Sequence, residues 1–357
     1  KNDGVLPLDK SKLKTIGVVG PNANSRAALI GNYHGTASRY ITVLEGIQNE
    51  VGEDVRILYS EGCHLSKDRV ENLAWSQDRI SEAVITAENS DVVIICVGLD
   101  ETLEGEEGDT GNSDASGDKK DLHLPKVQEE LIETVTAVGK PTIVVLMAGS
   151  AIDLSYADGN CNGILQAWYP GARGGKAVAD LLFGKVSPSG KLPVTFYRNL
   201  EGMPEFTDYS MKNRTYRYME SEALYPFGYG LTYGNVKVKD AKVLNQVTVD
   251  SDIELEVIVE NTGRDTEEVV QIYIKDVDSP FAVRNYSLSG FKRIEVKEGE
   301  SKKVNFTISN KAMMVVDEQG ERYVDSKHFT LFAGVSQPDS RSKALIGKTP
   351  VEVQVML

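Results

Sequence analysis

The sequence predicts an α/β chain: a doubly wound α/β/α sandwich followed by an all-β sandwich. Through the first half, short apolar runs alternate with helical patterns, and this alternation builds a layered parallel sheet. After about Tyr233 the helical patterns stop, and short strands alternate with turn sequences. The 357 residues also exceed the usual size of one domain.

The predicted strands of the first domain are near-continuous apolar runs, as expected where helices cover both faces of a sheet. They are Thr15–Val19, Val55–Tyr59, Asp91–Val97, Thr142–Met147 and Gly163–Trp168, with a final strand at Pro193–Tyr197. Apolar residues at helical spacing predict the helices between them. These are Thr42–Val51, Arg79–Asn89, Pro125–Val138 and Gly174–Phe183.

The second domain is expected to be an antiparallel sandwich without convincing helices after Val236. Its predicted strands are Ile253–Val259, Val269–Ile274, Phe291–Val296, Val304–Ile308 and Phe329–Phe332. Its aromatic residues, Phe291 among them, fall where strand cores are expected, so we assign this domain a supporting role. The preceding connector is rich in Tyr and Arg, which favours packing between the domains.

Composition excludes several classes of function. The net charge of -14 argues against a nucleic-acid partner, because neutralising phosphates needs a basic face. No apolar run approaches the roughly 18 residues of a membrane span, so we expect no membrane partner. Residues 1–14 lack an apolar segment of the secretory type, and we expect a cytoplasmic location. The three cysteines are an odd number at unrelated spacings, which indicates core thiols rather than a disulfide framework or zinc site.

Two glycine-rich segments differ from the known nucleotide-binding patterns. The segment Pro170–Ala177 resembles a phosphate loop only superficially, because Pro170 stands at the first glycine position and Ala177 replaces the Ser or Thr. The turn Gly20–Asn24 lacks the spacing of a dinucleotide fingerprint. The glycines of Gly171–Gly175 are better explained by close backbone approach at a helix start.

The acidic loop Asp100–Asp118 is the strongest functional signal. It begins where the apolar run ending at Val97 stops, and ligands of doubly wound sheets bind at such carboxyl ends. Crowding of its carboxylates is expected to raise the pKa of at least one, as a general acid requires. A solvated connector or an adventitious cation site explains the same composition, although the spacing does not match a helix-loop-helix calcium loop.

Four segments together resemble the C-terminal half of glycoside hydrolase family 3. They are Lys1–Leu8, Ala167–Gly175, Leu182–Pro193 and Leu224–Leu231. The tail resembles the fibronectin type III-like domain that often follows in that family, through Asn261–Gly263, Glu268–Tyr273, Leu288–Arg293 and Phe329–Gly334. The resemblance divides the chain into a family 3 domain at residues 1–212, a connector at 213–235 and a fibronectin type III-like domain at 236–357.

The resemblance implies a retaining, exo-acting β-glycosidase without a metal or organic cofactor. In the family, a separate N-terminal (β/α)8 barrel carries an aspartate nucleophile, and the loop here resembles the one that supplies the acid/base glutamate. By that register Glu106 is the general acid/base, three positions before Asp109, and Glu104 is its rival. Thr110 departs from the family's frequent Asp-Arg ending. Asp109 and Tyr33 are weaker candidates for substrate binding.

The implied partners are a β-linked oligosaccharide or aryl glycoside and the barrel, in cis or in trans. The resemblance implies that terminal non-reducing β-linked sugars are hydrolysed, by a β-xylosidase or a β-glucosidase, and the loop and the segment Ala333–Asp339 resemble bacterial β-xylosidases more. Two other hypotheses stay open. One is a non-catalytic carbohydrate-binding or structural module, and the other is an unrelated nucleotide-binding α/β protein.

Overall fold

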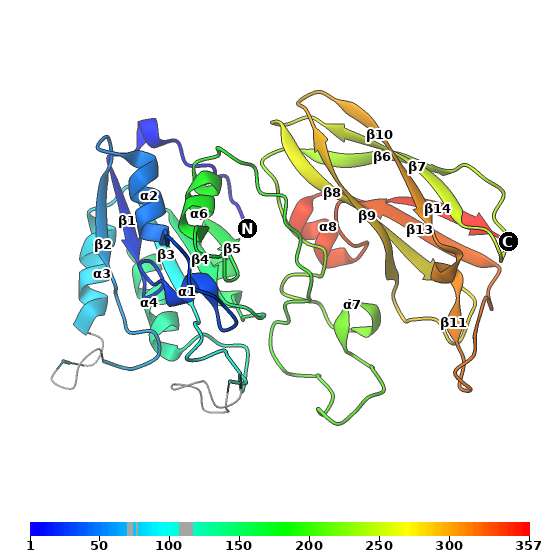
Figure 1. The fold of residues 1–357 in the computed structure, drawn as a ribbon, viewed down its shortest axis with the longest axis horizontal. Coiled ribbons are helices and arrows are strands. Elements are labelled where there is room, and N and C mark those ends of the chain that lie inside the picture. Colours follow the sequence, from blue (N-terminus) through cyan, green and yellow to red (C-terminus); the bar gives the residue numbers. More distant parts are fainter. Residues whose placement is uncertain (70–73, 76–77, 107–116) are drawn as a thin grey trace. The chain divides into compact units, whose positions relative to one another are not determined.

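The computed structural model describes residues 1–69, 74–75, 78–106 and 117–357 (Figure 1). The chain divides into two compact units, Lys1–Val186 and Ser187–Leu357. Each unit has its own buried apolar cluster, so each is described by itself.

The first unit is built on one parallel sheet. Its strands are β1 (Thr15–Val19), β2 (Arg56–Ser60), β3 (Val92–Gly98), β4 (Thr142–Met147) and β5 (Gly163–Gln166). Their spatial order is β2-β1-β3-β4-β5, and every neighbouring pair is parallel. Five of the six strands predicted for the first domain are confirmed to within about two residues, and the doubly wound sheet is confirmed.

The helices cover both faces of this sheet (Figure 1). They are α1 (Ala27–Ile30), α2 (Val43–Val51), α3 (Asp78–Glu88), α4 (Lys126–Thr136), α5 (Ser155–Asn160) and α6 (Gly174–Leu182), preceded by the 3-10 turn η1 (Lys10–Lys12). Helices α2 and α6 pack together on one face, and α3 and α4 pack together on the other. The four longer helices were predicted, and the short helices α1 and α5 were not.

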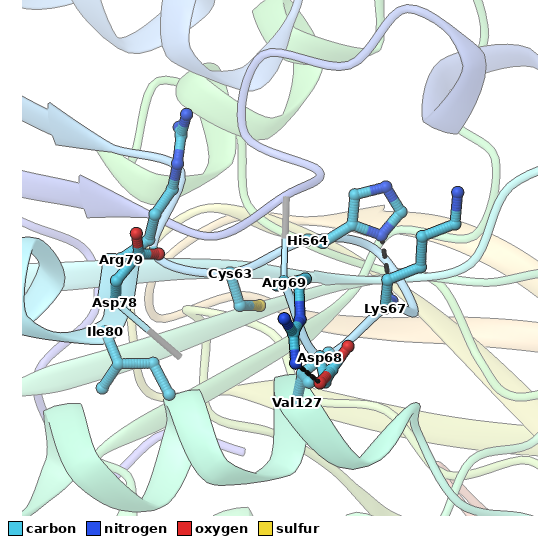
Figure 2. Close-up of a pocket in the computed structure, with 10 residues that line it drawn as sticks. Cys63, His64, Lys67, Asp68, Arg69, Asp78, Arg79, Ile80 and Val127 are labelled. Atoms are coloured by element: carbon cyan, nitrogen blue, oxygen red, sulfur yellow. Dashed lines mark hydrogen bonds and ion pairs between the residues drawn. The ribbon is translucent and has the colours of Figure 1, made fainter. Parts of the chain in front are cut away.

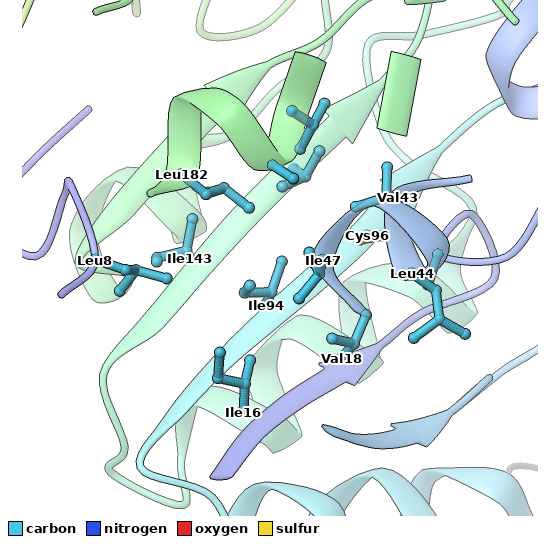
Figure 3. Close-up of a cluster of buried hydrophobic side chains, with 14 of the residues drawn as sticks. Leu8, Ile16, Val18, Val43, Leu44, Ile47, Ile94, Cys96, Ile143 and Leu182 are labelled. Atoms are coloured by element: carbon cyan, nitrogen blue, oxygen red, sulfur yellow. The ribbon is translucent and has the colours of Figure 1, made fainter. Parts of the chain in front are cut away.

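The core on the α2/α6 face explains why the strands read as unbroken apolar runs. Alternate residues of the central strands, such as Val18, Ile94 and Ile143, meet Ile47 of α2 and Leu182 of α6 (Figure 3). All five side chains are fully buried. The intervening strand residues face the α3/α4 layer, so both faces of β3 and β4 are withdrawn from water.

Helices α2 and α6 approach closely because glycines lie at their contact. A Cβ atom on Gly175 would lie 1.8 Å from the carbonyl oxygen of Thr42, and one on Gly46 would lie 2.0 Å from the carbonyl oxygen of Gly175. Backbone therefore meets backbone where any side chain would force the helices apart. The predicted role of the glycines at the start of α6 is confirmed at Gly175.

The second unit is a sandwich of antiparallel sheets. Its strands are β6 (Val236–Val243), β7 (Ile253–Asn261), β8 (Thr266–Asp276), β9 (Ser287–Val296), β10 (Ser301–Ile308), β11 (Val315–Val316), β12 (Arg322–Tyr323), β13 (His328–Gly334) and β14 (Val351–Met356). They form the sheets β10-β7-β6 and β14-β13-β8-β9 and the small pair β11-β12. Burial alternates strictly along β7, which is the mark of a sheet with one face on the core. The predicted all-β sandwich is confirmed.

Three predictions for the second half of the chain were wrong in detail. Helical turns do occur after Val236, namely η2 (Asn310–Met313) and α8 (Ser340–Ile346), and α7 (Thr215–Tyr218) lies before it. The segment Pro193–Tyr197 is not a strand, because only Phe196 makes a bridge, to Tyr225. Phe291 lies outside the core with 66% of its surface exposed. Alternation along β9 is too weak to show from sequence which face is buried.

The strand predicted at Gly163–Trp168 ends early, at Gln166. Trp168 has a φ of 56°, a conformation that bulky residues rarely adopt, and it cannot continue the strand. Among the residues that the structure describes, no helix is long and apolar enough to cross a membrane.

Candidate active site

The candidate site lies at the carboxyl ends of β1, β3, β4 and β5. The strand order reverses between β1 and β3, so the crossover connections leave in opposite directions there. In open α/β sheets, such a reversal leaves a crevice at the strand ends in which ligands bind. The acidic loop leaves β3 beside this position.

The base of the acidic loop is fixed by buried hydrogen bonds. Gln128 of α4 accepts a hydrogen bond from the amide of Gly98 and donates one to its carbonyl, both at 2.8 Å. Asn22 follows β1 and donates from its side chain to the carbonyl of Leu99 at 3.1 Å. Both polar side chains are fully buried. The loop therefore starts from a rigid position between two elements.

Glycines let the strand ends come together here. A Cβ on Gly98, whose φ is 145°, would lie 1.9 Å from the carbonyl oxygen of Met147. A Cβ on Gly20 would lie 2.1 Å from the carbonyl oxygen of Cys96. The amide of Leu99 then donates to the carbonyl of Met147 at 2.8 Å. Only glycine allows this approach, so the site depends on it.

The first residues of the loop form a tight turn. The Asp100 carboxylate accepts hydrogen bonds from the amide and hydroxyl of Thr102 at 2.9 and 2.6 Å. The amides of Leu103 and Glu104 donate to the carbonyl of Asp100 at 3.0 and 2.9 Å. Asp100 is thus used to shape the loop, in the manner usual for aspartate in turns.

Glu104 points back toward the strand ends. Its Oε2 accepts a hydrogen bond from the amide of Gly149, which follows β4, at 2.7 Å. The same oxygen accepts one from the hydroxyl of Tyr169, which follows β5, also at 2.7 Å. Burial, and then the hydrogen bond to Glu104, raise the pKa of the Tyr169 phenol well above its usual value. Tyr169 is therefore a neutral donor at every physiological pH.

Glu106 lies two residues further along the chain and is exposed. Its Oε2 accepts a hydrogen bond from the hydroxyl of Tyr33, whose own side chain is 84% exposed. Tyr33 belongs to the segment that follows α1, and the next residue, His34, contacts Glu101 at 3.1 Å. The carbonyl of Gly35, and then Glu101, raise the pKa of His34. Two loops from different strands therefore meet around Glu106.

Lys119 brings a positive charge near Glu104. Its ammonium donates to the carbonyl of Ala151 at 2.6 Å, and burial lowers its pKa while the nearby carboxylates of Glu104 and Asp121 oppose that shift. The chain reaches Lys119 through Gly117, where a Cβ would lie 2.3 Å from the carbonyl oxygen of Gly105. Residues on either side of segment 107–116 are therefore in contact.

With this geometry established, comparison with known proteins decides the family. The model of the glycosyl hydrolase family 3 C-terminal domain matches residues 1–233. The chain belongs to glycosyl hydrolase family 3. A fibronectin type III-like domain matches residues 268–337 of the same chain.

Relatives of this family 3 chain are much longer than the chain itself. It is 36% identical to a β-xylosidase of Formosa agariphila, over 94% of the chain and 46% of the relative. It is 34% identical to a periplasmic β-glucosidase of Salmonella typhimurium, over 92% of the chain and 46% of the relative. A solved β-glucosidase from Erythrobacter marinus superposes with a TM-score of 0.83 at 31% identity, covering the whole chain and 48% of its own. The chain thus spans about half the length of the relatives that it matches.

The structure separates the carboxylates that the sequence places together. Asp100, Glu101, Glu104 and Glu106 each have a different partner in the family 3 chain. Asp109 lies outside the described residues. The expectation that crowding raises the pKa of at least one carboxyl group of the loop stays a prediction. The assignment of Glu106, and not Glu104, as the general acid/base also stays a prediction.

Sequence reasoning missed three residues that shape this family 3 site. Tyr169, Gly149 and Lys119 all contact or approach Glu104. Tyr169 and Gly149 lie on other loops, and Lys119 lies one residue past the acidic loop in the same connection. The one available signal was position, since Gly149 and Tyr169 each follow a predicted strand at the same edge of the sheet.

A separate hollow lies beside α3 and α4, lined by Cys63, His64, Arg69 and Val127 (Figure 2). It encloses about 10 Å³, room for a single water molecule and not for a sugar. The Nδ1 atom of His64 accepts hydrogen bonds from two nearby backbone amides, which is a capping role. This hollow does not compete with the family 3 site at the strand ends.

Proposed function

We propose that this chain is the acid/base half of a retaining, exo-acting β-glycosidase, and that Glu106 is its general acid/base. The observation that carries the proposal is the placement of Glu106. It is an exposed carboxyl group on a loop with a rigid base, at the strand ends where doubly wound sheets bind ligands. Membership of glycosyl hydrolase family 3 supports the reaction class.

The chemistry requires two carboxyl groups on opposite sides of the glycosidic bond. In the first step, an aspartate on the barrel attacks the anomeric carbon while the Glu106 hydroxyl gives its proton to the departing glycosidic oxygen. In the second step, the Glu106 carboxylate takes a proton from water, and the resulting oxygen nucleophile displaces the aspartate from the sugar. Glu106 then carries a proton again, so the cycle closes without a cofactor.

Exposure of Glu106 fits this division of labour. The two carboxyl groups must come within about 5 to 5.5 Å in a retaining enzyme. A carboxyl that points out from its own domain is able to reach a nucleophile held by another. The proposed partner is the (β/α)8 barrel, in cis or in trans, and half the length of the relatives lies outside this chain.

The proposed substrate is a terminal non-reducing β-linked sugar. The relatives that support this class are named β-xylosidase and β-glucosidase. Of the two, we propose the β-xyloside as the better substrate. We also propose that the isolated chain is inactive, because the nucleophile is supplied by the barrel.

The first test measures release of nitrophenol from p-nitrophenyl β-xyloside. The chain is assayed alone and after mixing with, or fusion to, a family 3 barrel from the same source. We expect activity only when the barrel is present. Hydrolysis by the chain alone would mean that it contains its own nucleophile, and the division of labour would be wrong.

The second test places Glu106 in the reaction. In the barrel-complete enzyme, Glu106→Gln should reduce turnover of poor leaving groups by about 10² to 10⁴-fold, the usual contribution of acid/base catalysis. Activated aryl glycosides should lose less in the first step, because their leaving groups need no protonation. The control is Glu133→Gln on α4, which removes one exposed carboxylate outside the site. Equal losses for both leaving-group classes would contradict the assignment.

A further inference from the structure

We propose that Glu104 is a positioning residue, and that its contacts with Tyr169 and Gly149 anchor the loop that presents Glu106. This inference rests on the proposed function, because it explains how the general acid/base is held in place. It also removes Glu104 as the rival for that role.

Two donors from different strand ends converge on a single oxygen of Glu104. The amide of Gly149 and the hydroxyl of Tyr169 both lie 2.7 Å from Oε2. Hydrogen bonds to a carboxylate are among the stronger ones in proteins, and two on one atom define its position closely. The ammonium of Lys119 adds a favourable electrostatic interaction with Glu104. Glu104 therefore ties the loop after β3 to the ends of β4 and β5.

The Tyr169 ring is held between two glycines. A Cβ on Gly31 would lie 2.7 Å from the ring, and a Cβ on Gly149 would lie 2.9 Å from it. The ring fills the space that side chains at both positions would need, so it has little freedom to move. The preceding residue, Trp168, adopts the left-handed conformation, and such strained residues cluster at functional sites. Tyr169 is thus a rigid donor.

The same structure reaches Glu106 from the other side. Gly31 packs on the Tyr169 ring, and two residues later Tyr33 donates its hydroxyl to Glu106. On the acidic loop, Glu104 meets the Tyr169 hydroxyl, and two residues later the chain presents Glu106. Both segments that hold Glu106 are therefore positioned by contacts with Tyr169. A misplacement of about 1 Å in a catalytic group lowers the rate on the order of 100-fold, so the contacts of Tyr169 that position Glu106 should affect the rate of catalysis.

The geometry also explains why Glu104 is not the acid/base. Its Oε2 accepts both hydrogen bonds from groups of its own domain, on the side that faces the strand ends. A general acid must instead give a proton to a substrate oxygen that lies outside that domain. Glu104 is half-buried and accepts two hydrogen bonds at the strand ends, whereas Glu106 is exposed and accepts one from the exposed Tyr33.

The experiment has one part that needs no catalysis. Amide hydrogen exchange is measured on this chain for residues 100–106 in the parent, in Tyr169→Phe and in Glu104→Ala. Tyr169→Phe removes only the hydroxyl and keeps the packed ring. We expect at least about 10-fold faster exchange of these amides in both variants, because opening of the loop becomes easier. The control is Tyr156→Phe on α5, which removes a tyrosine hydroxyl away from the site and should change nothing there.

The second part uses the barrel-complete enzyme. Tyr169→Phe should lower kcat by about 10 to 100-fold with little change in KM, since placement and not ground-state binding is affected. Glu104→Gln keeps an acceptor oxygen and should lose less than Glu104→Ala. Azide replaces water as a nucleophile that needs no base, so it should restore deglycosylation to Glu106→Ala but not to Glu104→Ala.

Each outcome decides the inference. Unchanged exchange in both Tyr169→Phe and Glu104→Ala would overturn the anchor. Rescue of Glu104→Ala by azide would make Glu104 the acid/base and would overturn the positioning role. If exchange accelerates as expected but the barrel-complete enzyme hydrolyses no β-glycoside, the anchor stands and the proposed function fails.

Discussion

The contact between α2 and α6 allows a stability prediction to be worked from distances. In Gly175→Ala, the new Cβ would lie 1.8 Å from the carbonyl oxygen of Thr42 and 2.6 Å from that of Ile41. Carbon and oxygen need more than 3 Å, so the helices must separate by about 1 Å or more. Overpacking usually costs about 1–3 kcal/mol. We expect about 3 kcal/mol here, at the upper end, because both obstacles are backbone atoms that no rotamer change can move.

The assay is urea or thermal unfolding followed by tryptophan fluorescence. Both tryptophans, Trp75 and Trp168, belong to the first unit, so the signal reports that unit alone. For a domain of this size, about 3 kcal/mol corresponds to a fall in Tm of roughly 6 to 12 °C. The control is Gly159→Ala in α5, where a Cβ would meet nothing within 4 Å. That variant should be unchanged or gain up to about 1 kcal/mol from helix propensity.

The reciprocal variant tests the same contact from the other helix. A Cβ on Gly46 would lie 2.0 Å from the carbonyl oxygen of Gly175, so Gly46→Ala should be destabilised to a similar degree. The double variant should lose less than the sum, because one separation of the helices accommodates both methyl groups. A Gly175→Ala midpoint equal to that of Gly159→Ala would refute the reasoning.

Three further predictions concern buried and titrating groups. Lys191 and Glu268 form an ion pair at 2.8 Å with side chains 9% and 3% exposed. Lys191→Met should therefore lower the free energy of unfolding by about 3–5 kcal/mol, as measured by calorimetry, because it leaves the Glu268 charge buried. Adding Glu268→Gln should restore most of that loss. A double variant as unstable as Lys191→Met would contradict the prediction. The hydrogen bond to Glu129 raises the pKa of His123 above 6.5, so its stabilisation is complete below pH 6.5 and is lost as pH rises through the folded pKa. His123→Gln should flatten that part of the stability curve, and an NMR titration that places the folded pKa below 6.5 would contradict the sign. Burial raises the pKa of all three cysteine thiols, so a thiol reagent should react slowly with the native chain. After denaturation the reagent should react rapidly with all three thiols. Rapid labelling of the native chain would disprove this prediction.

The sequence was a good guide to the fold where burial is two-sided. Strands β3 and β4 are buried on both faces, and an unbroken apolar run predicts the ends of each strand to within one residue. It was a poorer guide where burial is weak. Strand β14 has a single buried residue, Val355, among intermediate and exposed positions, and it was missed. Helix α8 has signals that were available, an Asp339 N-cap and a left-handed Gly347 at its end, but its seven residues are too few for a clear period.

For the site, the sequence indicated the loop but not its internal order. The carboxylates of Asp100–Glu106 are equivalent in a string of letters, and the family resemblance ranked Glu106 above Glu104 by register alone. Their environments differ because Tyr169 lies 65 residues after Glu104 and Tyr33 lies 73 before Glu106. Contacts at that separation are set by the strand order of the sheet, which local pattern does not contain.

The contact of Gly117 with Gly105 has a consequence for protein engineering. Because Gly105 and Gly117 are in contact, any sequence that joins them closes a ring whose two ends stay at a fixed distance. Doubling the length of such a ring costs only about 0.6 kcal/mol in closure entropy. Grafting longer or shorter sequences between Glu106 and Gly117 should therefore leave Glu104 and Glu106 in place, which makes this segment a natural point for changing the surroundings of the candidate site.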